Sequence, residues 1–172
     1  LALGAHAVAA EETAPGLSAF APAGTLALGV NYWASKSATR MWQDWEPEEI
    51  AKDLDVLTAH GVTFLRVFPR WDVFQPIWEA HHPWRDQHVE TYLTADERPR
   101  PETPAGDAGV DERMMERFEA FCDLCAARGL RLVVAPLTGQ MTFRVYVPQA
   151  LERRDLYADP VALMWERRYL DY

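Results

Sequence analysis

The stretch EPEEIAKDLDVLTAHGVTFLRVF, residues 46–68, contains a helix signal followed at once by a strand signal. Pro47 suits the first helical position, acidic residues occupy the first turn, and Gly61 is a typical residue just past a helix end. The apolar residues that share one face of this helix are Ile50, Leu54 and Leu57. The sequence therefore predicts a helix over 46–61 and a buried strand over 62–71.

The same alternation of strand and helix extends to both sides of this stretch. The further expected elements are a strand at 25–33, a helix at 111–129 capped by Asp111, a strand at 130–137 and a helix at 159–172 capped by Asp159. Long loops are expected over 72–110 and from 138 to Tyr157. The βαβαβα order is typical of parallel strands joined by right-handed crossovers.

Two architectures fit this order, an open doubly wound α/β sheet and part of a (β/α)₈ barrel. Neither a G-x-G-x-x-G nor a G-x-x-x-x-G-K-[ST] motif is present, which weakens a nucleotide-binding function. A closed TIM barrel needs eight strand–helix units, typically in about 250 residues. We therefore predict a partial TIM (β/α)₈ barrel, about the first three β/α units, truncated before the fourth strand.

The chain is expected to divide into a tail or linker at 1–24 and the N-terminal part of a catalytic domain at 25–172. The first ten residues, LALGAHAVAA, resemble the apolar end of a secretory signal, which would imply export. A plain Ala-rich extension explains the same residues equally well. No run of about 18 apolar residues is present, so no membrane span is expected.

Composition excludes several functional classes. The net charge of −9 argues against a nucleic-acid partner and against an anionic membrane surface.

Cys122 and Cys125 are expected to be core residues on one helix face, because a zinc site would need two further ligands. Three histidines share the long loop without a frame to fix them, namely His81, His82 and His88. No metal and no cofactor is therefore expected.

Polar and aromatic residues follow each predicted strand, and six of the seven tryptophans fall between residues 33 and 84. In parallel α/β folds the strand ends are where ligands bind. Indole faces next to amides suit a carbohydrate, whose C–H face stacks on rings while its hydroxyls take hydrogen bonds. The candidate substrate contacts are Asn31, Trp33, Trp71, Gln75 and Gln140. The alternative is that some of these rings only bury loops.

Arg66 lies within a predicted strand, in the segment FLRVF. Strand alternation places Leu65 and Val67 on the helix side and Arg66 on the opposite side, toward the barrel interior. A guanidinium there is costly unless it is paired, most plausibly with a carboxylate. A purely structural ion pair is the alternative to a functional one.

Five segments together resemble the N-terminal part of a cellulase-like enzyme of glycoside hydrolase family 5, in the clan of retaining (β/α)₈ hydrolases. They are GVNYW, MWQDWEPEEIAKDLDVLTAHGVTFLRVF, FQPI, DERMMERFEAFCDLCAARGLRLVV and LTGQM, and the resemblance covers about residues 26–172. It implies that Gly29 and Asn31 match the family's Gly-x-Asn pattern. It also implies that Arg66 matches the arginine that steadies the nucleophile. Relatives often have a histidine in the third-strand loop, where this chain has Gln140.

The resemblance further implies two catalytic glutamates on the fourth and seventh strands, neither of which this chain contains. The expected function of the full-length protein is hydrolysis of β-linked poly- or oligosaccharides, such as mannan or glucan, by a retaining two-carboxylate mechanism. The chain itself is expected to bind or steady substrate and not to cleave it. Two alternatives stay open: a non-catalytic carbohydrate-binding barrel, and a complete doubly wound α/β protein. The sequence makes no prediction of oligomeric state.

Overall fold

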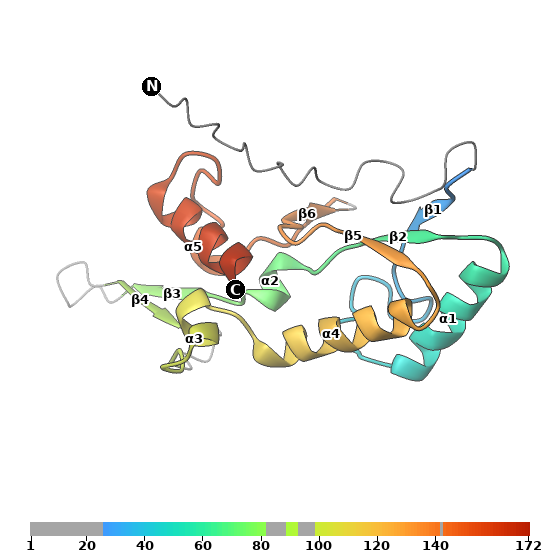
Figure 1. Ribbon diagram of the computed structural model, residues 1–172. Helices are drawn as coiled ribbons and strands as arrows, with labels where there is room; N and C mark the ends of the chain where they lie inside the picture. Colours follow the sequence, from blue (N-terminus) through green and yellow to red (C-terminus); the bar gives the residue numbers. More distant parts are fainter. Residues whose placement is uncertain (1–25, 82–88, 93–98, 142) are drawn as a thin grey trace, which may run out of the picture.

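In the computed structural model the described residues are 26–81, 89–92, 99–141 and 143–172. Figure 1 shows a parallel sheet with helices packed beneath it. The strands lie in the order β1 (Gly29–Asn31), β2 (Phe64–Val67) and β5 (Arg131–Val134). This order follows the chain order, and both pairings are parallel, as predicted. Each strand is shorter than the apolar run that predicted it, because the ends of each run continue into strand-flanking loops.

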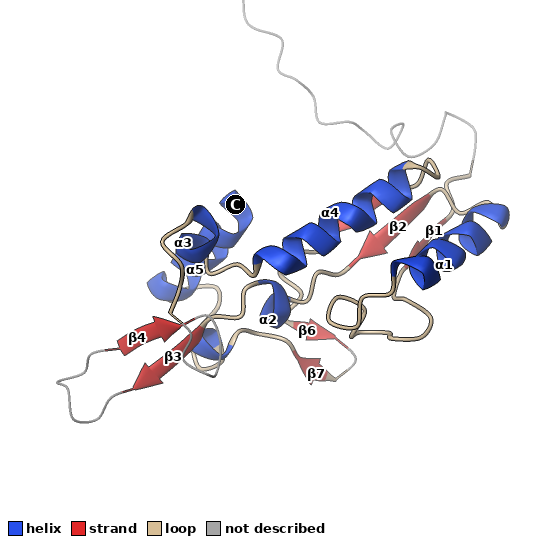
Figure 2. Ribbon diagram, turned by 90° about the horizontal axis from the view of Figure 1, so that it is seen from below, coloured by secondary structure: helices blue, strands red, loops and turns tan. Residues whose placement is uncertain are grey.

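Helices α1 (Pro47–Ala59) and α4 (Glu112–Ala126) contact each other and cover the same face of this sheet. Figures 1 and 2 show the two helices side by side beneath β2. Both helices were expected from the sequence, and α4 begins as predicted, with the Asp111 carboxylate accepting a hydrogen bond from the Met114 N–H. The residues that fill the layer between sheet and helices include Ile50, Leu54, Leu65, Val67, Met114 and Phe121.

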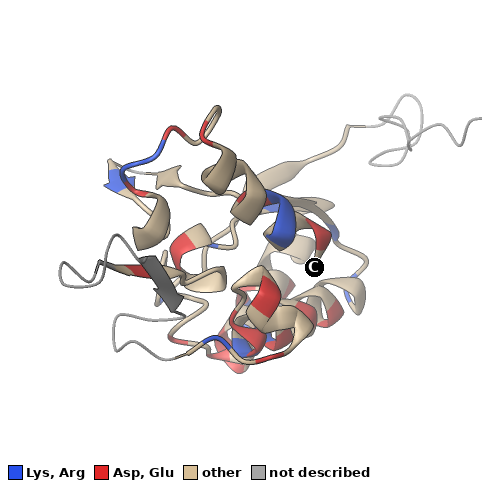
Figure 3. Cartoon of the chain, turned by 90° about the vertical axis from the view of Figure 1, so that its left-hand side faces the viewer, with Lys and Arg blue, Asp and Glu red and all other residues tan. Residues whose placement is uncertain are grey.

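Eight of the chain's 26 acidic residues lie on these two helices, and Figure 3 colours the acidic residues red. On α1 and α4 these residues are Glu48, Glu49, Asp53, Asp55, Glu112, Glu116, Glu119 and Asp123. These eight side chains belong to the helix layer, which lies across the sheet from the open face described below.

Helix α5 (Pro160–Asp171) follows the third parallel strand after a long connection and packs against the short helix α3 (Pro104–Ala108). The Asp159 carboxylate caps α5 by accepting hydrogen bonds from the Val161 and Ala162 N–H groups. The start of this helix was predicted, and Trp165 buries its ring in the core.

The two segments predicted to be loops contain regular structure, which corrects the sequence-based expectation. The first contains α2 (Trp71–Phe74), an antiparallel hairpin of β3 (Trp78–His81) and β4 (Val89–Tyr92), and α3. The second contains a short hairpin of β6 (Gln140–Met141) and β7 (Arg144–Val145) and a 3₁₀ turn, η2 (Gln149–Leu151). Both hairpins follow the carboxyl ends of parallel strands.

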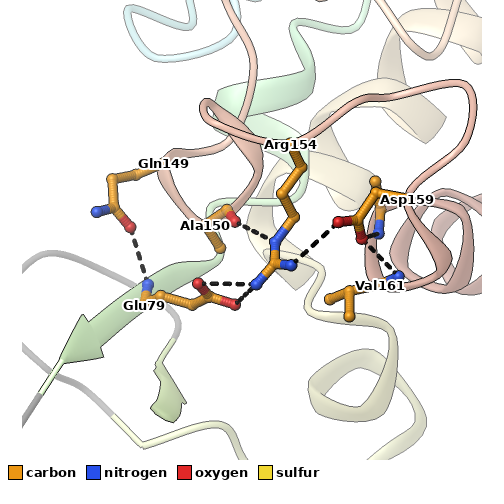
Figure 4. Close-up of polar contacts among 7 residues, drawn as sticks. Glu79, Gln149, Ala150, Arg154, Asp159 and Val161 are labelled. Atoms are coloured by element: carbon orange, nitrogen blue, oxygen red, sulfur yellow. Dashed lines mark hydrogen bonds and ion pairs between the residues drawn. The ribbon is translucent and has the colours of Figure 1, made fainter. Parts of the chain in front are cut away.

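A polar cluster around Arg154 explains why the first hairpin was not predictable from local pattern (Figure 4). The Arg154 guanidinium contacts both carboxylate oxygens of Glu79 on β3, at 2.9 and 3.2 Å, and one oxygen of Asp159 at 3.4 Å. The Gln149 side-chain oxygen accepts a hydrogen bond from the Glu79 N–H at 2.8 Å. Contacts between residues 70 or more positions apart thus hold β3 in place.

The predicted tail at 1–24 lies outside the described residues, and so does the LALGAHAVAA stretch on which export rested. Among the described helices, none is both long enough and apolar enough to cross a membrane.

Candidate functional site

A groove of about 730 Å³ lies on the helix-free face of the sheet, at the carboxyl ends of the parallel strands. Its lining comes from all three strand ends and consists of Asn31, Trp33, Ala38, Thr39, Arg66, Phe68, Ala135, Leu137, Thr138, Gly139, Gln140 and Met141. We call this the strand-end groove. Its volume falls in the range of small-molecule sites, and its walls mix apolar surface with a few polar groups.

Arg66 enters the groove from β2, on the side of the sheet opposite the helices. Its neighbours Leu65 and Val67 are both 0% exposed in the core, whereas Arg66 is exposed. The register places Arg66 level with Asn31 on one side and Val133 on the other. The predicted alternation along β2 is therefore present in the structure.

The Arg66 guanidinium rests on an aromatic stack. Its central carbon lies 4.8 Å from the ring centre of Phe68, and the Phe68 ring stacks on Trp33 with centres 5.3 Å apart and planes 16° apart. Cation–π contact holds the guanidinium over the groove while its N–H donors stay available. Among the described residues Arg66 forms no ion pair, and it is the only ionisable side chain in the groove lining. The groove therefore offers one positive charge to a carboxylate or a ligand.

Three of the predicted substrate contacts come together with Arg66. Asn31 ends β1, Trp33 follows it, and Gln140 begins the β6–β7 hairpin after β5. Asn31 and Gln140 are exposed and Trp33 is half-buried. The structure thus gathers two amides, an indole and a guanidinium at one edge of the sheet.

The structure does not bring Trp71 and Gln75 to this group, contrary to the sequence-based expectation. The short helix α2 turns both side chains inward, and they are 2% and 0% exposed. The Trp71 indole N–H donates to the Gln75 side-chain oxygen at 2.7 Å. The Gln75 amide then donates to the carbonyl oxygens of Ala108 and Trp165, both at 2.8 Å. These two residues join α2 to α3 and α5, so we leave them out of the proposed site.

Two members of the predicted tryptophan cluster, Trp42 and Trp71, belong to the core. Trp42 is 0% exposed and donates its indole N–H to the Phe68 carbonyl oxygen at 2.9 Å. Trp84 lies outside the described residues. Trp33 is the only tryptophan in the groove lining. Of these tryptophans, Trp33 therefore lines the groove, whereas Trp42 and Trp71 pack in the core.

The ion pair between Arg70 and Asp72 was not foreseen in the sequence. Two donors of the Arg70 guanidinium contact the two carboxylate oxygens of Asp72, at 3.1 and 2.5 Å. Asp72, the carboxylate that follows the second strand, is therefore already paired. The only sequence signal for this ion pair is the spacing of two positions between an arginine and an aspartate, and such a spacing often occurs by chance.

The two cysteines are free thiols, as the core interpretation predicts, with Cys125 buried and Cys122 half-buried. Burial raises the pKa of the Cys125 thiol to about 12, and it also raises the pKa of Cys122. Such thiols are poor nucleophiles and poor metal ligands at neutral pH. The described residues contain no group of three potential metal ligands, and the side chains of His81, His82 and His88 lie outside the described part.

A scan against models of protein families and a search of curated proteins found no match to this chain. Solved structures do match. The exo-β-1,4-mannosidase Op5Man5 from Opitutaceae bacterium strain TAV5 aligns at 27% identity and TM-score 0.63 over 84% of this chain and 21% of its own length. A GH5_18 protein from Streptomyces cattleya, solved with GlcNAc, aligns at 27% identity and TM-score 0.62 over 84% of this chain and 28% of its own.

Two further structures extend the comparison. The Streptomyces cattleya protein as a glutamate-to-alanine variant, in complex with Manβ1-4GlcNAc, aligns at 27% identity and TM-score 0.63 over 85% of this chain and 29% of its own. A GH5_18 protein from Bifidobacterium longum subsp. longum, at 19% identity and TM-score 0.63, covers 84% of this chain and 28% of its own length, and at that identity it supports the fold alone. This chain thus spans between 21% and 29% of these structures. Over its described residues, the chain has a family 5-like glycoside hydrolase fold.

Proposed function

We propose that residues 25–172 are the N-terminal part of a (β/α)₈ catalytic domain, and that the whole protein hydrolyses β-linked mannose- or glucose-containing saccharides. The observation that carries this proposal is the strand-end groove with Arg66 at its centre. Its position at the carboxyl ends of parallel strands is where barrel enzymes bind substrate. The agreement of sheet order with chain order supports a barrel over a doubly wound sheet, in which the strand order reverses.

In this proposal the groove holds a sugar ring by complementary chemistry. The groove-lining indole of Trp33 takes the apolar C–H face of the ring, and the amides of Asn31 and Gln140 take its hydroxyl groups. The proteins aligned at 27% identity include an exo-β-1,4-mannosidase and a complex with Manβ1-4GlcNAc. These neighbours favour β-1,4-linked mannosides as the first substrates to test.

Arg66 is the proposed support of the nucleophile. Its guanidinium has free donors toward the groove, and a carboxylate supplied by a later part of the protein would pair with it. Such a pairing keeps the carboxylate ionised and fixes its orientation for attack on the sugar carbon. A second carboxyl group about 5–5.5 Å from the first would protonate the leaving oxygen in a retaining mechanism. Without those two carboxylates this chain alone binds saccharide and does not cleave it.

The test uses the whole protein with Manβ1-4GlcNAc, β-1,4-mannan and cello-oligosaccharides. We expect reducing ends to form, with the first product anomer retained when followed by proton NMR. Arg66→Met should lower kcat about a hundredfold, a loss typical of one preorganised charge in an active site. The matched control is Arg113→Met, because Arg113 is exposed on α4, across the sheet from the groove, and should leave kcat unchanged.

A non-catalytic carbohydrate-binding protein is the second candidate, and the absence of a carboxylate from the groove lining of the described residues favours it. Binding of the same saccharides without release of reducing ends would establish that function. Neither binding nor hydrolysis of any of these sugars would rule out both candidates.

A further inference from the structure

Arg70 lies where three strand-end segments meet, just outside the groove lining. One guanidinium nitrogen donates to the Thr39 carbonyl oxygen at 3.3 Å and to the Gln43 side-chain oxygen at 3.2 Å. The other two nitrogens donate hydrogen bonds to the two carboxylate oxygens of Asp72. The guanidinium carbon also lies 4.4 Å from the ring centre of Tyr146. Only 13% of the Arg70 side chain is exposed, so these contacts are held largely out of water.

Each segment that Arg70 contacts carries part of the strand-end groove. Thr39 lines the groove in the loop after β1, and Thr138, which lines it after β5, forms a parallel bridge with Arg70 itself. Tyr146, which directly follows β7, connects the hairpin to the segments after β5 and β2. Its N–H donates to the Gly139 carbonyl oxygen at 2.7 Å, and its own carbonyl oxygen accepts from the Asp72 N–H at 2.9 Å. Arg70 therefore joins the loop after β1, the segment after β2 and the hairpin after β5.

We propose that Arg70 is a positioning residue that fixes the spacing of the groove walls, and so the fit of the saccharide between Trp33 and Gln140. It does this through the Thr39 loop and the β6–β7 hairpin, without touching the sugar. The planar guanidinium of Arg70 contacts the Asp72 carboxylate, the Thr39 carbonyl oxygen and the Tyr146 ring at the same time. A lysine ammonium cannot reproduce that set of contacts. The kinetic consequence of this proposal rests on the proposed function, whereas its structural consequence does not.

The test compares Arg70→Met with Arg128→Met in the whole protein. Arg128 is a matched control because its Nε lies 2.7 Å from an Asp55 oxygen, its Nη1 donates to the Leu124 carbonyl, and its side chain is 19% exposed. Arg128 follows α4 at the amino end of β5, away from the groove lining. Each variant is measured by hydrogen–deuterium exchange of peptides covering Thr39 and Tyr146, and by KM and kcat on the saccharides above.

We expect Arg70→Met to speed amide exchange about tenfold or more at both peptides and to raise KM about tenfold with a smaller change in kcat, because the walls lose their common anchor. Arg128→Met should leave the exchange of both peptides and KM within twofold of the parent. Arg70→Lys, which keeps the charge, is expected to behave like Arg70→Met and serves as the test variant if the methionine protein does not fold.

Exchange and KM that stay at parent values in the foldable Arg70 variant would overturn the proposal, as would equal effects of Arg70→Met and Arg128→Met. Faster exchange at both peptides in a protein that hydrolyses none of the saccharides would support the positioning role and refute the proposed function. The two proposals therefore fail separately.

Discussion

At the scale of single residues, two tryptophans that resemble each other in the sequence have different surroundings. Trp33 lines the groove and stacks on Phe68, whereas Trp42 is completely buried and hydrogen-bonded to a backbone carbonyl. We expect Trp33→Ala to raise KM about tenfold, because the stacking face for the sugar is lost. Trp42→Ala should instead cost about 3–5 kcal/mol of folding free energy through the cavity it leaves. Thermal melts and saccharide kinetics on both variants separate the two roles, and equal KM effects would contradict them.

Alternation along a strand predicted the orientation of Arg66, because neighbours in an extended chain must face opposite sides. The same sequence could not reveal the orientation of Trp71 and Gln75. These residues follow a strand, as ligand-binding residues often do, but a single helical turn rotates them into the core. That rotation depends on carbonyl acceptors at Ala108 and Trp165, more than 30 positions away in the chain. Local pattern carries no signal of such partners.

Cys125 gives a pH-dependent prediction at the residue scale. Burial raises its pKa from 9.0 to about 12, so at pH 8 its thiolate fraction should be about a thousandfold below that of an unperturbed thiol. The stability that the protonated thiol contributes is complete below about pH 9 and is lost as the pH rises toward 12. Alkylation by iodoacetamide, followed by peptide mass spectrometry, should be slow in the native protein and fast after unfolding. Equal rates in the two states would contradict the buried position.

At the scale of elements, the parallel strands and their helices were predictable because their signals are local. Apolar period, a proline at the first helical position and an aspartate cap each lie within the element that they define. The β3–β4 hairpin has no such signal, since Arg154 and Gln149 hold β3 from far along the chain. The short helix α3 does carry local signals, with a Thr103 cap, Pro104 at its first position and a left-handed Gly109 at its end, although a loop was expected there.

The Arg154 cluster yields a prediction for this hairpin. Glu79 is only 9% exposed at its side chain, so Arg154→Met would leave a nearly buried carboxylate without its cation. We expect a loss of about 3 kcal/mol in folding free energy and faster amide exchange in β3. Arg167→Met is the control, because its ion pair with Asp171 is exposed and worth a few tenths of a kcal/mol at most. Similar losses for the two variants would show that the cluster does not anchor the hairpin.

At the scale of the whole molecule, the sheet has one covered face and one open face. The helices α1 and α4 cover one side, and the groove side exposes Arg66 together with Val133 and Leu137. An open sheet face of this kind is what the interior of a barrel presents before the remaining strands enclose it. In the proposed barrel these residues would line the interior, and Arg66 would point toward the catalytic carboxylates.

The proposed site is tested most directly by a crystal structure of the whole protein with a bound β-1,4-linked mannoside. We expect the sugar in the strand-end groove, with a ring face against Trp33 and a carboxylate from a later strand within about 4 Å of the Arg66 guanidinium. Arg66 directed to bulk solvent or into the helix layer, with the saccharide bound elsewhere, would contradict the proposed site.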